Sequence, residues 1–410
     1  MNTPRRTRNR KAAPRLALAL AGGGPLGAIY EIGALCALDA CLPGLDLNRC
    51  DHYVGVSAGG FIAAGLANGM TPRELRDAFI DDRPGPQSFD PSWLLKPAWG
   101  ELAGRAARVP GLSASALQAW LLQGKSFTSA FERLGAALPT GVLDNEAIHR
   151  QIERLFSLPG RTNDFRQLGT KLTLVATELD SGEAAPFGQP GWDHVPISRA
   201  IQASAALPGL FPPVCIDGQH YVDGALKKTV HASVALEDGI DLLICLNPLV
   251  PFRAGPDAPR QRGIPALVEG GLPAVMSQTF RSMIHSRLEL GFKHYERAWP
   301  DTDILLIEPE QSDAELFFAN TFSYSQRREM AEHAFQQTRR LLLRRAGELA
   351  PRLARHGIAL DRDALSDPDL RLLPPLPPRR PAAPDAVARL HLVLDRLQAA
   401  LPATPARPAP

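Results

Sequence analysis

One pentapeptide, GVSAG at residues 55–59, constrains the fold more than any other part of this 410-residue chain. It follows a short apolar segment and precedes a small-residue apolar run at 61–67. A serine between a strand and a helix occupies a strained turn, and glycines beside it let the two backbones pass closely. The helix also directs the positive end of its dipole at the serine. The pattern predicts that Ser57 is a nucleophile supported by Gly55 and Gly59; the alternative is a glycine-rich turn with an incidental serine.

Short continuous apolar runs along the chain predict strands that are buried on both faces of a sheet. They lie at Leu16–Leu20, 52–54, 171–177, Leu242–Leu246 and 304–307. Helical patterns alternate with these runs at 26–38, 58–68 and 145–156, and from Thr71 onward. Asp144 is the predicted N-cap of the helix at 145–156, and Ser325 that of a later helix. Apolar residues every four positions from Met276 to Phe292 predict one apolar helix face. This alternation is typical of an α/β domain.

Composition changes divide the chain into three parts. Residues 1–14 are expected to be a disordered basic arm, and 15–350 to form the main domain. Within that domain, 82–140 is expected to be a cap or lid region, with its Trp, Pro and Gly residues near the start. Residues 351–410 are expected to be a proline-rich tail with a short amphipathic helix at 385–401.

Bulk properties exclude several classes of protein. The formal net charge of +2 gives no reason to expect a nucleic-acid partner, and the five irregularly spaced cysteines fit thiols in a reducing compartment, without zinc-ligand spacing. The basic N-terminus and Leu16–Leu20 imitate a signal peptide, but the run is short and leads directly into glycines. We therefore expect a cytoplasmic protein with no cleaved signal peptide and no transmembrane span, able to contact membranes peripherally.

A glycine loop, GGGPLG at 22–27, follows the first predicted strand. Gly22, Gly24 and Gly27 match the G-x-G-x-x-G pattern of dinucleotide-binding proteins. A loop of this kind points N–H groups at an anion beside a helix N-terminus. That anion is either a pyrophosphate, which predicts an oxidoreductase, or the oxyanion of an acyl-transfer intermediate. The pattern by itself leaves both open.

A third segment, YVDGA at 221–225, ends another short apolar run. Asp-Gly in isolation is usually a turn. The segment before it, ASAALPGLFPPV at 203–214, is a small-residue helix that ends in a rigid Pro-Gly bend. A serine needs a base to take its proton, and histidine is the usual one. His220 and His231 flank this segment, so a histidine-based triad is an open variant.

In their order along the chain, the motifs GGGPLG, GVSAG, ASAALPGLFPPV and YVDGA closely resemble those of the patatin-like phospholipases of bacterial type, over about residues 15–310. The resemblance implies a three-layer α/β/α fold with a mainly parallel central sheet, helical cap insertions and a C-terminal helical extension. It also implies a Ser–Asp dyad without histidine, with Ser57 as nucleophile and Asp223 as general base. The resemblance also implies that the oxyanion hole is formed by Gly22, Gly23, Gly24 and Ala58. The glycines that support the motifs are then Gly27, Gly55, Gly59 and Gly224. Ala225 stands where the family often has a second glycine.

The function implied by the resemblance is cleavage of fatty-acyl ester bonds in phospholipids, lysophospholipids or related lipids. No cofactor and no metal are expected, and the expected partner is a lipid or membrane surface. The sequence does not indicate a protein activator. Two other classes stay open, a dinucleotide-binding oxidoreductase and a non-catalytic lipid-binding scaffold.

Overall fold

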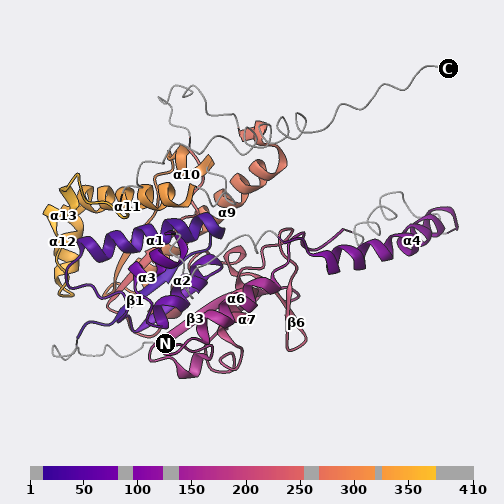
Figure 1. Cartoon of the computed structure of the whole chain (residues 1–410), viewed down its shortest axis with the longest axis horizontal. Helices are drawn as coiled ribbons and strands as arrows, with labels where there is room; N and C mark the ends of the chain where they lie inside the picture. Colours follow the sequence, from indigo (N-terminus) through magenta and orange to yellow (C-terminus); the bar gives the residue numbers. More distant parts are fainter. Residues whose placement is uncertain (1–12, 82–95, 123–137, 254–266, 319–325, 375–410) are drawn as a thin grey trace, which may run out of the picture. The chain divides into compact units, whose positions relative to one another are not determined.

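The computed structural model describes residues 13–81, 96–122, 138–253, 267–318 and 326–374. Within them the chain builds an eight-stranded sheet in the order β5-β6-β3-β2-β1-β7-β8, with β4 also paired to β3. Figure 1 labels β1, β3 and β6 in this sheet. The strands are β1 (Leu16–Leu20), β2 (His52–Val56), β3 (Lys171–Glu178), β4 (Ala184–Phe187), β5 (Val214–Ile216), β6 (Gln219–Asp223), β7 (Leu242–Leu246) and β8 (Asp303–Ile307). The five strands from β3 to β8 through β1 run parallel, and β4, β5 and β6 pair antiparallel.

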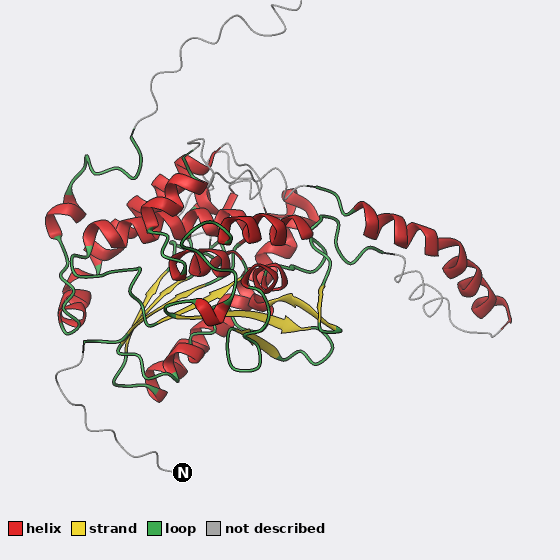
Figure 2. Ribbon diagram, turned by 60° about the horizontal axis from the view of Figure 1, so that its bottom comes forward, coloured by secondary structure: helices red, strands yellow, loops and turns green. Residues whose placement is uncertain are grey.

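Helices cover the sheet, as Figure 2 shows with red helices around yellow strands. They are α1 (Gly24–Cys41), α2 (Ala58–Ala67), α3 (Pro72–Phe79), α4 (Trp99–Leu122), α6 (Glu146–Phe156), α7 (Ile197–Ser204), α8 (Ser233–Leu236), α9 (Gly271–Ala298), α10 (Ala314–Phe318), α11 (Arg327–Arg344), α12 (Ala346–Ala354) and α13 (Arg362–Ser366). Three 3-10 turns are also described: η2 (Phe165–Gln167), η3 (Gly224–Leu226) and η4 (Leu267–Gly270).

Alternation along β1 separates the two faces of the sheet. Ala17 and Ala19 belong to a buried cluster with Leu236 of α8 and with Leu288 and Tyr295 of α9. Side chains alternate across a strand, so the intervening residues of β1 point to the opposite face, where α2 packs on β1 and β2. The α/β fold with a central, mainly parallel sheet between helical layers is therefore confirmed.

The parallel strands bring several loops to one edge of the sheet. Leu20 at the end of β1 pairs with Gly55 of β2 on one side and with Leu246 of β7 on the other. Leu246 in turn pairs with Ile307 at the end of β8. The segments that follow β1, β2, β7 and β8 consequently lie along the same carboxyl edge, which is where open α/β sheets bind their ligands.

The strand predictions are confirmed, and β2, β3 and β8 extend slightly beyond the predicted runs. Thr71 caps α3 through a capping box with Glu74, as the sequence indicates. The N-cap of α6 is Asn145 and not Asp144, although the Asp144 carboxylate accepts the Glu146 N–H at 2.9 Å. Ser325 lies outside the described residues, and the N-cap of α11 is Gln326.

The single apolar face predicted from Met276 to Phe292 is wrong for α9. Leu288 is buried, whereas Met276 and Phe280 are 42% and 40% exposed. A step of four residues turns about 40° beyond a full helical turn, so the four steps from Met276 to Phe292 move around the helix. The N-terminal half of α9 therefore presents apolar side chains outward, and the C-terminal half packs on the sheet.

The structure tests only some of the predicted divisions of the chain. Most of the basic arm, much of the 82–140 region and the helix at 385–401 lie outside the described residues; Trp99, at the start of α4, is 72% exposed. The boundary expected at residue 350 falls inside α12, and the compact unit continues to Leu372 because α13 packs on α1 and α11. No described helix combines the length and the apolar character that crossing a bilayer requires.

Candidate active site

Ser57 lies in the turn between β2 and α2, and its backbone is strained. Its φ of 53° is in the left-handed region, which costs a residue with a Cβ roughly 1–3 kcal/mol. Glycines make the turn sterically feasible: a Cβ on Gly59 would lie 2.3 Å from the Ala21 carbonyl oxygen, and one on Gly55 would lie 2.4 Å from the Gly60 Cα. The sequence therefore folds locally into a nucleophile elbow that projects the serine at the carboxyl edge.

Asp223 reaches Ser57 through strand register. In β3, Val175 pairs with Val56 of β2, and the next residue, Ala176, pairs with Asp223 at the end of β6. The chain then turns over the end of β3 so closely that a Cβ on Gly224 would lie 2.1 Å from the Val175 carbonyl oxygen. These two pairings place the aspartate at the same edge as the serine, with only β3 between their two strands.

The Ser57 hydroxyl lies beside the Asp223 carboxylate and lowers the pKa of that group. Both residues are buried, with 6% and 3% of their surfaces exposed. The Asp223 carboxylate also accepts the Ala225 N–H at 2.9 Å. Burial raises the pKa of Asp223 to about 6, and the Ala225 N–H and the Ser57 hydroxyl oppose that rise. The carboxylate is therefore ionised at neutral pH and is a stronger base than an exposed aspartate.

The glycine loop lies directly against the serine. A Cβ on Gly22 would lie 2.9 Å from the Ser57 Cβ and 3.5 Å from its Oγ. Gly24 has a φ of 61° and begins α1, and Gly23 is the N-cap. Within the described residues the N–H groups of Gly22, Gly23 and Gly24 have no hydrogen-bond acceptor. Free N–H groups beside a serine hydroxyl and a helix N-terminus can stabilise an oxyanion.

Hydrogen bonds hold this loop in place from both sides. The Ala21 N–H donates to the Leu246 carbonyl of β7 at 3.0 Å, and the Ala21 carbonyl accepts the Gly59 N–H at 3.1 Å. Ala58 is the first residue of α2, so its N–H has no partner within that helix. The predicted oxyanion group is thus gathered around Ser57.

Ser204 is a site residue that sequence reasoning missed. Its Oγ accepts the Ser57 backbone N–H at 2.8 Å and donates to the Val175 carbonyl at 2.6 Å, and the residue is fully buried. It ends α7 inside the ASAALPG run, and a polar side chain among buried small residues was the available signal. The contact satisfies the amide of the strained serine and fixes the elbow to β3.

The two flanking histidines have no hydrogen bond to Ser57 or Asp223 among the described residues. His231 is buried, and its Nε2 donates to the Gly224 carbonyl at 3.3 Å. Burial lowers the pKa of His231 to about 4. His220 is exposed in β6. Within the described residues, neither histidine is thus linked to the serine or the aspartate by a hydrogen bond.

Several known proteins are similar to this chain. VipD from Legionella pneumophila matches with 14% identity over 84% of this chain and 79% of its own, at a TM-score of 0.33. Full-length ExoU, in complex with SpcU from the type III secretion system of Pseudomonas aeruginosa, matches with 17% identity over 87% of this chain and 69% of its own, at a TM-score of 0.26. A second structure, of the type III effector protein ExoU, matches with 17% identity over 83% of this chain and 53% of its own, at a TM-score of 0.31.

The family model described as patatin-like phospholipase matches residues 18–236, more than half of the chain. The matched span runs from the first strand of the sheet to the end of α8, and it contains the glycine loop, the serine elbow and the aspartate. The chain therefore belongs to the patatin-like phospholipase family.

Proposed function

We propose that this protein hydrolyses fatty-acyl esters of phospholipids or lysophospholipids with a Ser57–Asp223 dyad. Membership of the family makes it a lipid acyl hydrolase by class. The observation that carries the finer assignment is the Ser57 hydroxyl beside the buried Asp223 carboxylate, whose pKa it lowers. A serine becomes a useful nucleophile when a neighbouring base takes its proton.

In the first half of the reaction, the Ser57 oxygen attacks the ester carbonyl carbon while its proton passes to Asp223. The carbonyl oxygen becomes an oxyanion, which the N–H groups of Gly22, Gly23, Gly24 and Ala58 stabilise. One such donor is typically worth about 2.7–4 kcal/mol of barrier. The intermediate then collapses, the acyl–oxygen bond of the substrate breaks, and the leaving alcohol takes the proton from Asp223.

In the second half, Asp223 takes a proton from water, and the hydroxide attacks the acyl-serine carbonyl. A second oxyanion forms in the same place and collapses, so that Ser57 leaves, recovers the proton from Asp223 and the fatty acid is released. The pKa of about 6 suits both directions of proton transfer, because a catalytic base works best when its pKa is near the operating pH.

The test uses Ser57→Ala and Asp223→Asn with an exposed serine, Ser181→Ala, as the matched control. We expect both site variants to lose release of fatty acid from lysophospholipid while remaining folded, and the control to retain it. A fluorophosphonate probe should label the parent and the control, but not Ser57→Ala. Retained turnover in either site variant would contradict the dyad.

The same assay separates the alternatives. A scaffold without catalysis predicts no labelling of Ser57 and no fatty acid release by the parent. A dinucleotide-binding oxidoreductase predicts saturable binding of nicotinamide or flavin nucleotides in equilibrium dialysis. A histidine triad predicts a large loss of activity in His220→Ala or His231→Ala; we expect neither, because the hydrogen bond of His231 goes to the Gly224 backbone.

A further inference from the structure

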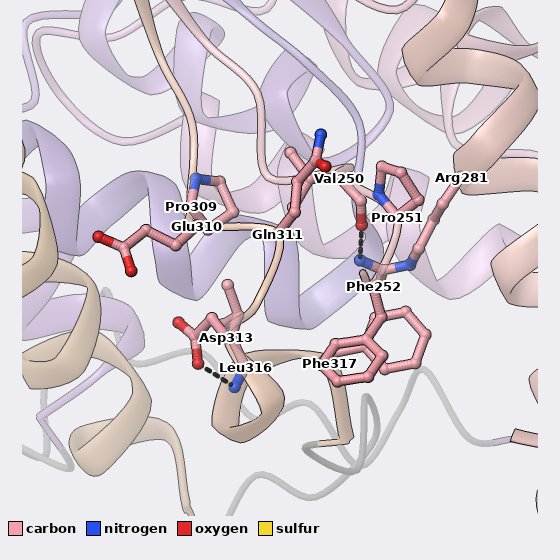
Figure 3. A pocket seen from close by; sticks show the side chains of 10 residues that line it. All are labelled: Val250, Pro251, Phe252, Arg281, Pro309, Glu310, Gln311, Asp313, Leu316 and Phe317. Atoms are coloured by element: carbon pink, nitrogen blue, oxygen red, sulfur yellow. Dashed lines mark hydrogen bonds between the residues drawn. The ribbon is translucent and has the colours of Figure 1, made fainter. Parts of the chain in front are cut away.

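A second polar feature lies along the carboxyl edge, at the ends of β7 and β8. The segments that follow these strands meet α9 and α10 around a small pocket that is open to solvent. Neither Ser57 nor Asp223 lines it. Figure 3 shows its lining residues, Val250, Pro251, Phe252, Arg281, Pro309, Glu310, Gln311, Asp313, Leu316 and Phe317.

Arg281 of α9 is the cation of this pocket, and it lacks a carboxylate partner. Its Nη1 donates to the Val250 carbonyl at 3.4 Å, a long hydrogen bond, and its guanidinium lies 5.3 Å from the centre of the Phe317 ring. Figure 3 shows the side chain reaching toward Val250 above the two phenylalanines. Among the ion pairs within the described ranges, none includes Arg281. Burial lowers the pKa of this guanidinium.

The acidic residues of the pocket are engaged elsewhere. Glu310 pairs with Arg344 at 2.7 Å. Asp313 accepts hydrogen bonds from His333 at 2.7 Å and from Gln337 at 2.8 Å. Arg281 is therefore a half-buried cation without a compensating anion from the described chain. Such an arrangement costs free energy, and an anionic ligand would recover it.

The surroundings hold the guanidinium in a fixed position. Gln278, one turn earlier on α9, exchanges two hydrogen bonds with the backbone of Phe252, at 3.0 and 2.8 Å. The rings of Phe252 and Phe317 lie 5.2 Å apart and form an apolar floor. A rigid, planar guanidinium on an apolar floor suits a phosphate group, because it offers parallel N–H donors to two phosphate oxygens.

The pocket lies close to the oxyanion loop along the chain. Pro248 contacts that loop: its Cγ would lie 2.9 Å from a Cβ on Gly23 and 3.1 Å from one on Gly27. Val250 follows two residues later, a span of at most about 7 Å. Only a short stretch of chain therefore separates the oxyanion loop from the pocket. In a glycerophospholipid only a few single bonds separate the ester carbonyl from the phosphate.

We propose that Arg281 binds the phosphate group of the substrate and so selects phosphate-bearing lipids over neutral acylglycerols. This inference rests on the proposed function for its catalytic half. Apolar side chains that are exposed near the pocket fit a lipid ligand, and on α9 they are Leu272, Val275, Met276, Phe280 and Met283. The ligand group is a phosphate ester; free inorganic phosphate shares its chemistry, and the experiment separates the two.

The test compares 1-octanoyl-lysophosphatidylcholine with 1-octanoylglycerol, which share the acyl ester and differ in the phosphate head group. Removing a charge-assisted hydrogen-bonding partner typically weakens binding about 10- to 100-fold. We therefore expect Arg281→Gln to raise KM for the lysophospholipid by at least ~10-fold and to leave kcat/KM for octanoylglycerol within ~2-fold. Arg281→Lys should restore part of the loss, since it keeps the charge without the planar fork.

The matched control is Arg287→Gln, an exposed arginine on the same helix, which should change neither substrate. Equal losses on both substrates in Arg281→Gln, or no loss on either, would overturn the proposal. So would an equal effect in Arg287→Gln. Thermal unfolding of each variant establishes that the comparison is between folded proteins.

A binding measurement keeps this proposal distinct from the catalytic one. Calorimetry with Ser57→Ala measures binding of glycerophosphocholine and of inorganic phosphate without turnover. Binding of glycerophosphocholine that Arg281→Gln abolishes supports the phosphate site, even if the parent hydrolyses no ester. Binding of inorganic phosphate alone would overturn the assignment to a lipid head group. Turnover that does not distinguish the two substrates would contradict the proposal while leaving the dyad intact.

Discussion

Replacing Asp223 with asparagine should change activity and stability in opposite directions. The carboxylate is buried, and its pKa rises from 3.8 to about 6 on folding. At about 1.4 kcal/mol per pKa unit, the rise corresponds to roughly 3 kcal/mol that the folded chain spends on keeping this group ionised. Asparagine keeps an oxygen that can accept the Ala225 N–H and has no charge to bury. It cannot, however, accept the serine proton.

The effect depends on pH in a defined direction. Because the pKa is higher in the folded than in the unfolded chain, the folded state binds more protons between about pH 4 and pH 6. The destabilisation is therefore fully present above pH 6 and shrinks as the pH falls toward 4. We expect Asp223→Asn to be more stable than the parent by up to about 3 kcal/mol near pH 7.5, and this gain to shrink by about 2 kcal/mol near pH 4.5.

Urea titrations of the parent and the variant at the two pH values, followed by circular dichroism, measure both quantities. Turnover of lysophospholipid at neutral pH should fall by about 10²–10⁴-fold, the usual contribution of a positioned base. Asp180→Asn, an exposed aspartate near the end of β3, is the control for the chemical change and should leave the urea midpoint almost unchanged. A variant that is less stable than the parent at neutral pH, or equally stabilised at both pH values, would refute the argument from burial.

Three further predictions follow from the same geometry. In the parent, kcat/KM on a soluble ester should fall about tenfold per pH unit below pH 6, because only the ionised Asp223 accepts a proton; a flat profile down to pH 5 would contradict this. Ser204→Ala removes the acceptor of a buried amide, so urea titration should show a loss of about 1–3 kcal/mol together with a lower kcat. In Gly22→Ala the new Cβ would meet the Ser57 side chain at 2.9 Å, so initial rates should fall well below those of the parent, whereas Gly104→Ala, with open space around it, should change nothing.

The sequence carried much of the fold because its signals are local. The strands β1, β2, β3, β7 and β8 are continuous apolar runs, and burial on both sheet faces requires that pattern. The serine turn could be located because a strand, a small-residue pentapeptide and a helix follow one another directly. The capping box of Thr71 is equally local. Features fixed by a few neighbouring residues can therefore be predicted from the sequence alone.

Other features depend on pairing between distant segments. Only the register of β3 with both β2 and β6 explains how Asp223 reaches Ser57, and no local pattern encodes that register. Ser204 is one small residue among several, and its role appears only when α7 is packed on β3. Arg281 could not be identified from the sequence for the same reason. It lacks a carboxylate partner because Glu310 pairs with Arg344 and Asp313 binds His333, and these contacts join distant segments.

Ala21 shows how the fold keeps a strained serine in place. Its N–H donates to Leu246 of β7 and its carbonyl accepts the Gly59 N–H of α2, so this one residue is tied to the elements on either side of β1. A serine at a φ of 53° persists only if its surroundings leave no relaxed alternative. Gly59 cannot move away from Ala21 without breaking that hydrogen bond, and Ser204 holds the Ser57 amide from the other side. The strain at the proposed nucleophile is thus maintained by contacts from β1, β7 and α7, which explains why small residues recur in motifs so far apart in the chain.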